Sequence, residues 1–315
     1  MIDRDDLVAE PAVLPYVAVP AGERPALDDI ARRAAQQWCL PQPELLRLSM
    51  NAVYAAGPDV VLRVGRPPAP PAAALALAKA LADAGIAVAR PAIVEVVSDG
   101  GLSVLAFERV HPCGEEIDWR AVGRMVRCLH RLDRGVVPAA YPRPRGLDFP
   151  WWQLPALLAL TIEEPVGAML DATAVGAMRA CLDRHATTMV AARTVDRVLC
   201  HGDLHPGNII QSSSGPVLLD WDLLCTESAA WDHGPLITWT SRWGGATGVY
   251  ESFAVGYGAD LRHDAFAMAF ADLRLLAATL MRVRAAAANP AARPEAERRI
   301  AFWRGDPDPP MWSAM

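Results

Sequence analysis

The residues of this chain most suited to chemistry lie between positions 201 and 222. Two segments carry them, HGDLHPGN at 201–208 and LLDWD at 218–222, with a turn between the two. Apolar runs flank both segments, so we expect a hairpin-like element in the core with its polar side chains gathered at one edge. Such a cluster needs hydrogen bonds or a bound metal ion to offset its removal from water.

Phosphoryl transfer explains the spacing of these polar residues. The reaction needs little covalent chemistry from the protein and mainly requires positioning and charge neutralisation. Asp203 can accept the proton of an acceptor hydroxyl, while Asn208 and Asp220 can hold Mg²⁺ against nucleotide phosphates. Protein kinases use the same order, His-x-Asp followed by Asn and then Asp. Asp222 is either a second metal ligand or a capping group.

Both segments resemble the aminoglycoside phosphotransferase and choline kinase-like family, a branch of the protein-kinase-like fold. The resemblance covers roughly residues 45–290 and extends to VLAFERV at 104–110, to a helix ending in Leu129-His130, and to Trp231-Asp232. It implies an α+β, bilobal protein-kinase-like fold, with a small antiparallel β N-lobe of five strands and a larger helical C-lobe. ATP and Mg²⁺ are the cofactors that it implies.

The resemblance also assigns roles to individual residues. It implies that Asp203 is the general base, that Asn208 and Asp220 bind Mg²⁺, and that residues 107–110 meet adenine. The expected nucleotide contacts are Arg63, Ser49, Asn51, Phe107, Glu108 and Val110. We expect His201, His205 and Asp232 to support the catalytic loop rather than to react.

Two departures from the family pattern concern the nucleotide. The third strand carries Arg63 where the family usually has Lys, and Lys79 is the only lysine of the chain. The helix position that matches the pairing Glu of the family is Ala74. Arg63 therefore binds phosphate without a partner, or Glu95 or another acid replaces that partner, or nucleotide binding is weakened. The loop around Ser49 also lacks a glycine-rich signature.

Other interpretations of the same residues remain open at this stage. A two-metal hydrolase could use six ligands, His201, Asp203, His205, Asp220, Asp222 and His233. A non-catalytic or weakly active nucleotide-binding relative would account for Ala74 and the unusual loop. Trp231, Trp239 and Trp243 recur at helical spacing, which indicates a core stripe before a substrate-lining role.

The remaining sequence predicts the elements that must position this chemistry. Residues 1–110 form the nucleotide-binding lobe, with an irregular lead at 1–23, strands at 45–48, 52–56, 60–64, 93–97 and 102–108, and helices at 27–38 and 72–84. Residues 111–315 form the C-lobe, with helices at 118–132, 152–162, 173–192, 230–242, 249–257, 264–288 and 294–303, and a loose tail at 305–315. Asp118 and Asp264 are candidate N-caps.

Composition limits the class of protein and of partner. The 315 residues are 52% hydrophobic and 21% charged, with a net charge of −6 spread along the chain. We expect a folded cytoplasmic enzyme with no nucleic-acid or membrane partner and a hydroxyl-bearing small-molecule substrate. From Trp221 onward the sequence contains eleven acidic residues and nine arginines. This near balance of charge favours a neutral or monocationic metabolite over an aminoglycoside as the substrate. The six cysteines contain no C-x-x-C pair and are expected to be reduced core residues.

Overall fold

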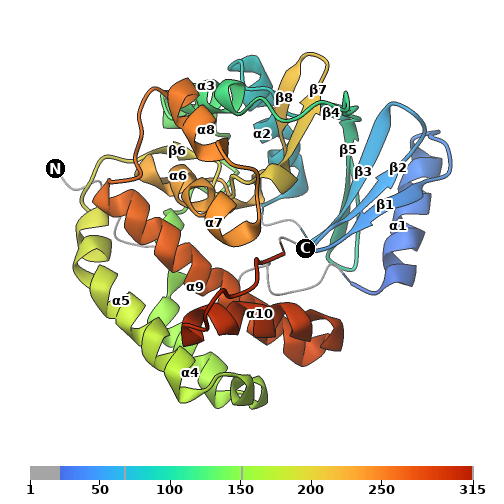
Figure 1. Ribbon diagram of the computed structural model, residues 1–315. Coiled ribbons are helices and arrows are strands. Elements are labelled where there is room, and N and C mark those ends of the chain that lie inside the picture. Colours follow the sequence, from blue (N-terminus) through green and yellow to red (C-terminus); the bar gives the residue numbers. More distant parts are fainter. Residues whose placement is uncertain (1–21, 67–68, 150–151, 314–315) are drawn as a thin grey trace.

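A five-stranded antiparallel sheet forms the N-terminal lobe. The computed structural model describes residues 22–66, 69–149 and 152–313. The strands are β1 (Glu44–Leu48), β2 (Ala52–Ala55), β3 (Val60–Gly65), β4 (Pro91–Asp99) and β5 (Leu102–Glu108), in the order β1-β2-β3-β5-β4. Figure 1 shows this sheet on one side of the molecule, with α1 (Arg24–Gln37) packed on its outer face.

Side-chain alternation along the strands gives the sheet two different faces. Leu62 and Val64 of β3 are buried against α1, in one core with Leu27 and Ile30. Val61 and Arg63, between them in sequence, point to the opposite face because successive strand residues alternate. This second face is the one turned toward the C-lobe, so β3 delivers Arg63 into the space between the lobes.

Helix α2 (Pro71–Asp83) joins the sheet to the C-lobe. It begins with a proline at its first position and ends before Gly85, whose φ of +86° suits a helix C-terminus. Leu77 and Leu81 lie in one core with Val122 and Val126 of the C-lobe. The backbone N–H of Leu218 donates to the carbonyl of Ala87 at 2.9 Å, which ties the segment after α2 to the strand that precedes Asp220. The lobe boundary at residue 110 therefore remains a prediction.

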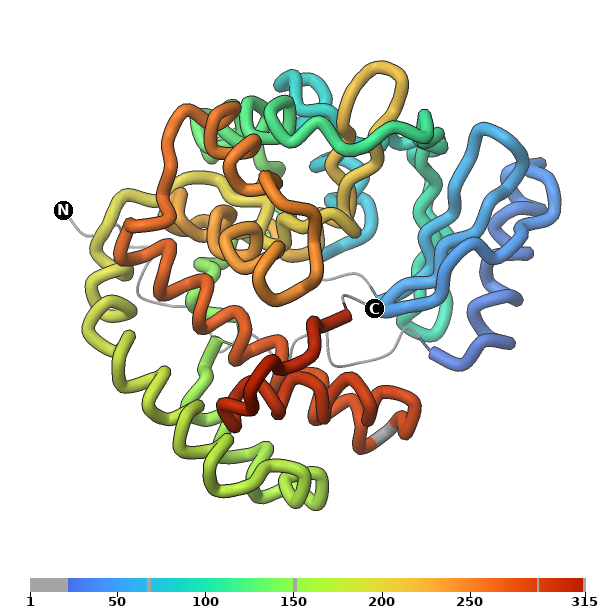
Figure 2. The backbone as a smooth tube through the Cα atoms, viewed as in Figure 1, coloured from blue at the N-terminus to red at the C-terminus, as the bar shows by residue number. Residues whose placement is uncertain are grey.

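Helices dominate the C-lobe, as predicted. They are α3 (Trp119–Leu129), α4 (Leu154–Glu163), α5 (Ala172–Ala192), α6 (Ala230–Ile237), α7 (Trp239–Trp243), α8 (Val249–Tyr257), α9 (Ala265–Ala288) and α10 (Arg293–Arg304). Short 3-10 turns occur at Arg134–Val136, Gly146–Asp148, Pro165–Met169, Pro206–Asn208, Trp221–Leu223 and Pro290–Ala292. Asp118 and Asp264 accept hydrogen bonds from the first turns of α3 and α9, which confirms both N-caps. The long helix α9 runs through this lobe, with α4, α5 and α10 beside it (Figures 1 and 2).

Two small two-stranded sheets hold the chemistry-bearing segments. Strand β6 (Val198–Cys200) pairs with β9 (Cys225–Glu227), and β7 (Ile209–Ser212) pairs with β8 (Gly215–Leu218), both antiparallel. HGDLHPGN connects β6 to β7, and LLDWD connects β8 to β9. Because β6 pairs with β9 and β7 pairs with β8, the two ends of one loop lie beside the two ends of the other, and the loops are held next to each other.

Three sequence expectations need correction. The helix predicted over 230–242 is broken at Thr238 into α6 and α7, three residues after Pro235, which cannot donate a helix hydrogen bond. The tail is ordered at Trp312, which is 3% exposed and donates its backbone N–H to Arg242. Cys39, Cys113 and Cys128 are exposed rather than in the core, although all six cysteines are free thiols. Most of the irregular lead expected at 1–23 lies outside the described residues.

No described helix is long and apolar enough to cross a bilayer.

Candidate active site

A cavity of about 390 Å³ lies between the two lobes, within the range of small-molecule sites. Residues from both lobes line it, including every nucleotide contact and every metal ligand expected from the sequence: Ser49, Asn51, Arg63, Phe107, Glu108, Val110, Asn208, Asp220 and Asp222. Its walls are largely apolar, with Val61 and Leu105 from the sheet and Leu77 from α2. Such walls suit a flat aromatic base, and the polar lining residues come from both lobes.

The loop at 201–208, which carries the expected base and is called the catalytic loop below, is held by a buried carboxylate. Asp232 of α6 accepts hydrogen bonds from the backbone N–H groups of His201 (2.8 Å) and Gly202 (2.9 Å). His201 is fully buried and its Nε2 donates to the carbonyl of Leu219 at 2.9 Å. This hydrogen bond connects the loop to the segment 218–222, which carries the expected metal ligands and is called the metal loop below. Gly202 has a φ of +88°, and a Cβ there would meet the Leu223 carbonyl at 1.8 Å, so only glycine fits.

Asp203 lies beside the cavity and is surrounded by basic groups. Arg274 of α9 forms an ion pair with Oδ1, and the Asn208 amide donates to Oδ2 at 3.2 Å. His205 Nε2 lies 3.5 Å from the same Oδ2. Burial raises the pKa of Asp203, but Arg274 and His205 outweigh it and hold that pKa well below the ordinary range. The carboxylate is therefore ionised at neutral pH, as a proton acceptor must be.

Asn208, Asp220 and Asp222 offer a set of oxygen donors at one end of the cavity. The Asn208 amide nitrogen donates to Asp203, which leaves its carbonyl oxygen for another partner. Asp220 has a left-handed backbone with φ of +58°, a conformation that is uncommon outside glycine and concentrates at functional sites. Carboxylate and amide oxygens are the donors that Mg²⁺ prefers, so these residues fit that ion.

Arg63 reaches across the cleft to the two acids of the metal loop. Its Nη2 forms an ion pair with Asp222 and lies 3.5 Å from Asp220. Burial opposes its charge, but the two carboxylates outweigh that effect and raise the pKa of Arg63. Glu95, the other acid considered as its partner, is exposed on β4. Asp222 thus occupies the role of acidic partner, and Ala74 lines the cavity without any charge.

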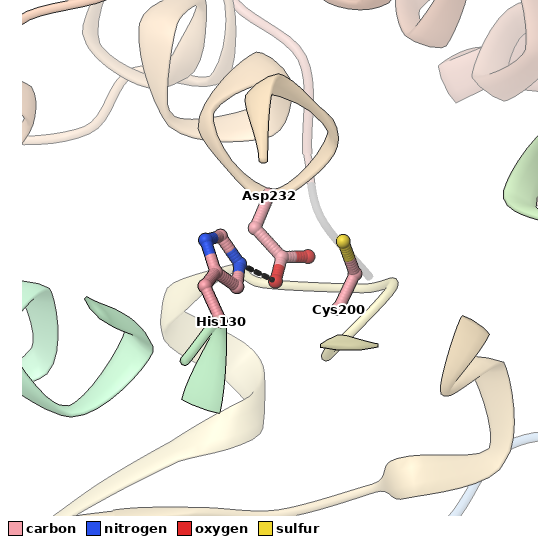
Figure 3. Close-up of side chains that lie close together, drawn as sticks. All are labelled: His130, Cys200 and Asp232. Atoms are coloured by element: carbon pink, nitrogen blue, oxygen red, sulfur yellow. Dashed lines mark hydrogen bonds and ion pairs between the residues drawn. The ribbon is translucent and has the colours of Figure 1, made fainter. Parts of the chain in front are cut away.

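A second cluster of ionisable side chains lies beneath the catalytic loop. Figure 3 shows His130, Cys200 and Asp232 close together, with His130 Nε2 at 3.1 Å from Asp232. The Asp232 hydrogen bond overcomes the effect of burial and raises the pKa of His130 to about 9, while the pKa of Asp232 is lowered. Burial raises the pKa of the Cys200 thiol, which disfavours the thiolate that binds metals. The cluster is an ion pair that braces the loop, as expected for Asp232.

The two-metal hydrolase set is not assembled. His233 is fully buried and its Nδ1 bonds to the Tyr250 hydroxyl at 2.9 Å, away from the cleft. His201 Nε2 is occupied by Leu219. Among the described residues, the three-residue group with metal-binding geometry is His130, Cys200 and Asp232, and none of these three belongs to the proposed hydrolase set.

Two residues at the site were missed by sequence reasoning. Arg274 contacts Asp203, and it forms, with Asp272, the charged part of the otherwise apolar stretch 265–281 of α9. This isolated charged pair is the sequence feature that could have indicated a functional role for Arg274. Tyr141 lines the cavity and donates its hydroxyl to the Trp221 carbonyl at 2.9 Å. It lies in an irregular segment, and nothing in its local sequence sets it apart.

Comparison with known proteins agrees with this architecture. The family model described as "Phosphotransferase enzyme family" matches residues 49–272. The chain therefore belongs to this family and is an enzyme that transfers phosphoryl groups to hydroxyl groups of small molecules. No curated protein matches it in sequence.

Solved structures of known phosphotransferases share the fold. The GDP complex of aminoglycoside 2′-phosphotransferase-IIIa matches with a TM-score of 0.67 and 13% identity, over 90% of this chain and 99% of that chain. A choline/ethanolamine kinase family protein from Mesorhizobium loti matches with a TM-score of 0.58 and 19% identity, over 96% and 93%. The macrolide 2′-phosphotransferase from Brachybacterium faecium matches with a TM-score of 0.55 and 20% identity, over 86% and 98%. These likenesses confirm the bilobal kinase-like fold.

Proposed function

We propose that this enzyme is an ATP-dependent O-phosphotransferase in which Asp203 is the general base. The proposal is carried by the hydrogen bond from the Asn208 amide to Asp203, at the edge of a cavity that Asp220 and Arg63 also line. In the reaction a hydroxyl oxygen of the acceptor forms a bond to the γ-phosphorus, and the bond from that phosphorus to the ADP oxygen breaks. The hydroxyl proton passes to Asp203.

Asn208, Asp220 and Asp222 are the proposed ligands of Mg²⁺. Their oxygen donors fit this ion, and when bound it would neutralise charge on the phosphate oxygens. Arg63 is the proposed phosphate contact from the N-lobe, since its guanidinium enters the same cavity. An arginine can bind phosphate oxygens through two parallel hydrogen bonds, so the loss of the family lysine does not remove the function.

The adenine base is proposed to lie between the sheet and the C-lobe, beside Phe107, Glu108 and Val110. Ser49 and Asn51 line the same cavity from the loop between β1 and β2 and would approach the phosphates. Solved relatives contain ADP or GDP, which supports nucleotide use by this fold. Since ATP is a cytoplasmic metabolite, we place the reaction in the cytoplasm.

A coupled assay of ADP release tests the proposal. Wild-type protein with Mg-ATP is screened against sugars, amino sugars, hydroxy acids, aminoglycosides and amino alcohols, with GTP in a parallel series. We expect acceptor-dependent ADP release that requires Mg²⁺ and is lost in Asp203→Asn. Tight Mg-ATP binding without turnover on any acceptor would instead identify a non-catalytic nucleotide-binding relative.

A further inference from the structure

Asp203 is paired with an arginine that does not line the nucleotide cavity. Arg274 contacts Asp203 Oδ1, yet neither of these two residues lines the cavity that holds Arg63. The two side chains are 20% and 22% exposed, so both remain accessible to a ligand. Any hydroxyl that reaches Asp203 from outside the nucleotide cavity must therefore approach Arg274 as well.

Among the described residues, the side-chain hydrogen bond of Arg274 is the one to Asp203, which leaves further donors for a ligand. A guanidinium has five N–H donors, and among the described residues Asp203 is the one acid within ion-pair distance of Arg274. Arg274 lies in an otherwise largely apolar stretch of α9, and Asp203 offsets the free-energy cost of removing its charge from water. A ligand anion could share the guanidinium with Asp203 through a second pair of donors.

The charges around the acceptor side of Asp203 are basic. Arg274 forms an ion pair with Asp203 Oδ1, and His205 Nε2 lies 3.5 Å from Asp203 Oδ2. The acids of the site, Asp220 and Asp222, lie within reach of Arg63 in the nucleotide cavity. An acceptor rich in ammonium groups would meet like charge beside the base, whereas an anionic acceptor would meet opposite charge.

A row of stacked aromatic rings begins at His205, beside Asp203. The His205 ring stacks on Trp239 with centroids 6.2 Å apart, and Trp239 stacks on Trp243 at 5.9 Å. Trp239 and Trp243 are half-buried, in contrast to the fully packed Trp231. This row supplies an apolar wall for a carbon skeleton that binds with its anionic group at Arg274.

We propose that Arg274 is an acceptor-binding residue and that the acceptor is a hydroxyl compound with an anionic group, a carboxylate or a phosphate ester, near the reacting hydroxyl. The inference rests on the proposed function, because it takes Asp203 as the group that orients the hydroxyl. It changes the expected substrate class from a neutral or monocationic metabolite to an anionic one.

Matched acceptors test the assignment on the full-length enzyme with Mg-ATP. Hydroxy acids are compared with their amides, sugar phosphates with the parent sugars, and both sets with aminoglycosides. We expect the anionic member of at least one pair to have a kcat/KM at least about tenfold higher. The two sets of pairs distinguish a carboxylate from a phosphate ester. A preference for neutral or cationic members would overturn the proposal.

Substitution of Arg274 separates acceptor binding from a structural role. Arg274→Gln should lower kcat/KM for the preferred anionic acceptor by about 10- to 150-fold, mainly through KM, as expected for a lost charged hydrogen bond. The neutral partner should change less than about threefold, and Arg274→Lys should restore part of the preference. Equal losses for both acceptors would show that Arg274 only positions Asp203 or acts on the transferred phosphoryl group. Arg284→Gln, on the same helix but paired with Glu164, is the matched control.

A binding measurement covers the case without turnover. Thermal unfolding is followed with each hydroxy acid or sugar phosphate of the panel, for the wild type and for Arg274→Gln. We expect anionic compounds to raise the Tm of the wild type and not that of the variant. An unchanged rise in Arg274→Gln would refute the anion site, whereas failure of all acceptors in the ADP assay with this binding intact would refute only the proposed reaction.

Discussion

Two arginines pair with two carboxylates at the centre of this enzyme. Arg63 contacts Asp222 in the nucleotide cavity, and Arg274 contacts Asp203 beside it. Each ion pair joins residues far apart in the chain, and each arginine is proposed to bind an anionic group of one substrate. The charge on Asp203 is kept by its neighbours, while burial acts against it.

Substitution of the proposed base should affect turnover and leave nucleotide binding intact. Asp203→Asn keeps the shape of the side chain and removes the proton acceptor, so kcat is expected to fall by about 10²–10⁴-fold. Calorimetry should show Mg-ATP affinity close to that of the wild type. Asp83→Asn, at an exposed ion pair with Lys79, is the control and should retain full activity. Wild-type turnover in Asp203→Asn would remove this residue from the mechanism.

The phosphate contact is tested at Arg63. Arg63→Ala should raise KM for ATP by about 10- to 150-fold, because a charged hydrogen bond to phosphate is lost. Ala74→Glu should leave activity equal or lower, since Arg63 already has an acidic partner in Asp222. Arg66→Ala, in an exposed residue just after β3, serves as control. If Arg63→Ala binds ATP normally, the assignment of the β3 position is wrong.

At the scale of elements, the catalytic loop depends on the helices below it. Asp232 belongs to α6 and His130 follows α3, so their ion pair connects two helices to the backbone of the loop after β6. The pKa of His130 is raised from 6.5 to about 9, whereas that of Asp232 is lowered. The fold is therefore stabilised by this pair over the pH range in which His130 is protonated and Asp232 is ionised.

The pH dependence of stability follows from the raised pKa of His130. The contribution of His130 to the free energy of unfolding is complete below its unfolded-state pKa near 6.5. This contribution is lost as the pH rises through its folded-state pKa of about 9. The free energy of unfolding should fall by up to about 3 kcal/mol between pH 6 and pH 10 from this group. Denaturant titrations of His130→Gln should show a flatter profile, and those of the exposed His263→Gln a wild-type profile. Equal slopes in wild type and His130→Gln would contradict the ion pair.

At the scale of the molecule, nucleotide binding should stabilise both lobes together. The cavity takes walls from the sheet, from α2 and from the C-lobe loops, so a nucleotide bound there would contact all three. A ligand at 100 times its Kd adds about 2.7 kcal/mol to the stability of the state that binds it. Helix α2 shares a core with the C-lobe, which supports coupled unfolding of the lobes.

Loss of a metal ligand should remove this stabilisation. Mg-ATP is expected to raise the Tm of the wild type and to have little effect on Asp220→Ala, since the metal would lose an anionic ligand. Without Mg-ATP the variant should unfold near the wild-type temperature, because the Asp220 side chain is 46% exposed. Asp29→Ala, an exposed acid on α1, controls for general charge effects. A wild-type Tm increase in Asp220→Ala would contradict the metal assignment.

The sequence by itself determined the element types, their order and the two loops that carry the chemistry. Apolar periodicity and turn residues predicted the five strands and most helices, and Asp118 and Asp264 marked helix starts because capping is a local interaction. The motif spacing was sufficient to predict the family. The break between α6 and α7 was missed, although Pro235 was visible, because packing decides whether a helix continues past a proline.

Only the tertiary structure decided which charges meet. Asp222 replaces the missing helix acid beside Arg63, and Arg274 pairs with Asp203 from a helix 71 residues later in the chain. The first contact depends on the packing of the N-terminal sheet beside the metal loop, and the second depends on the packing of α9 beside the catalytic loop. The spacing of residues in the sequence predicts which side chains are neighbours within one helix turn or one pair of strands. Ion pairs between distant elements depend instead on how those elements pack.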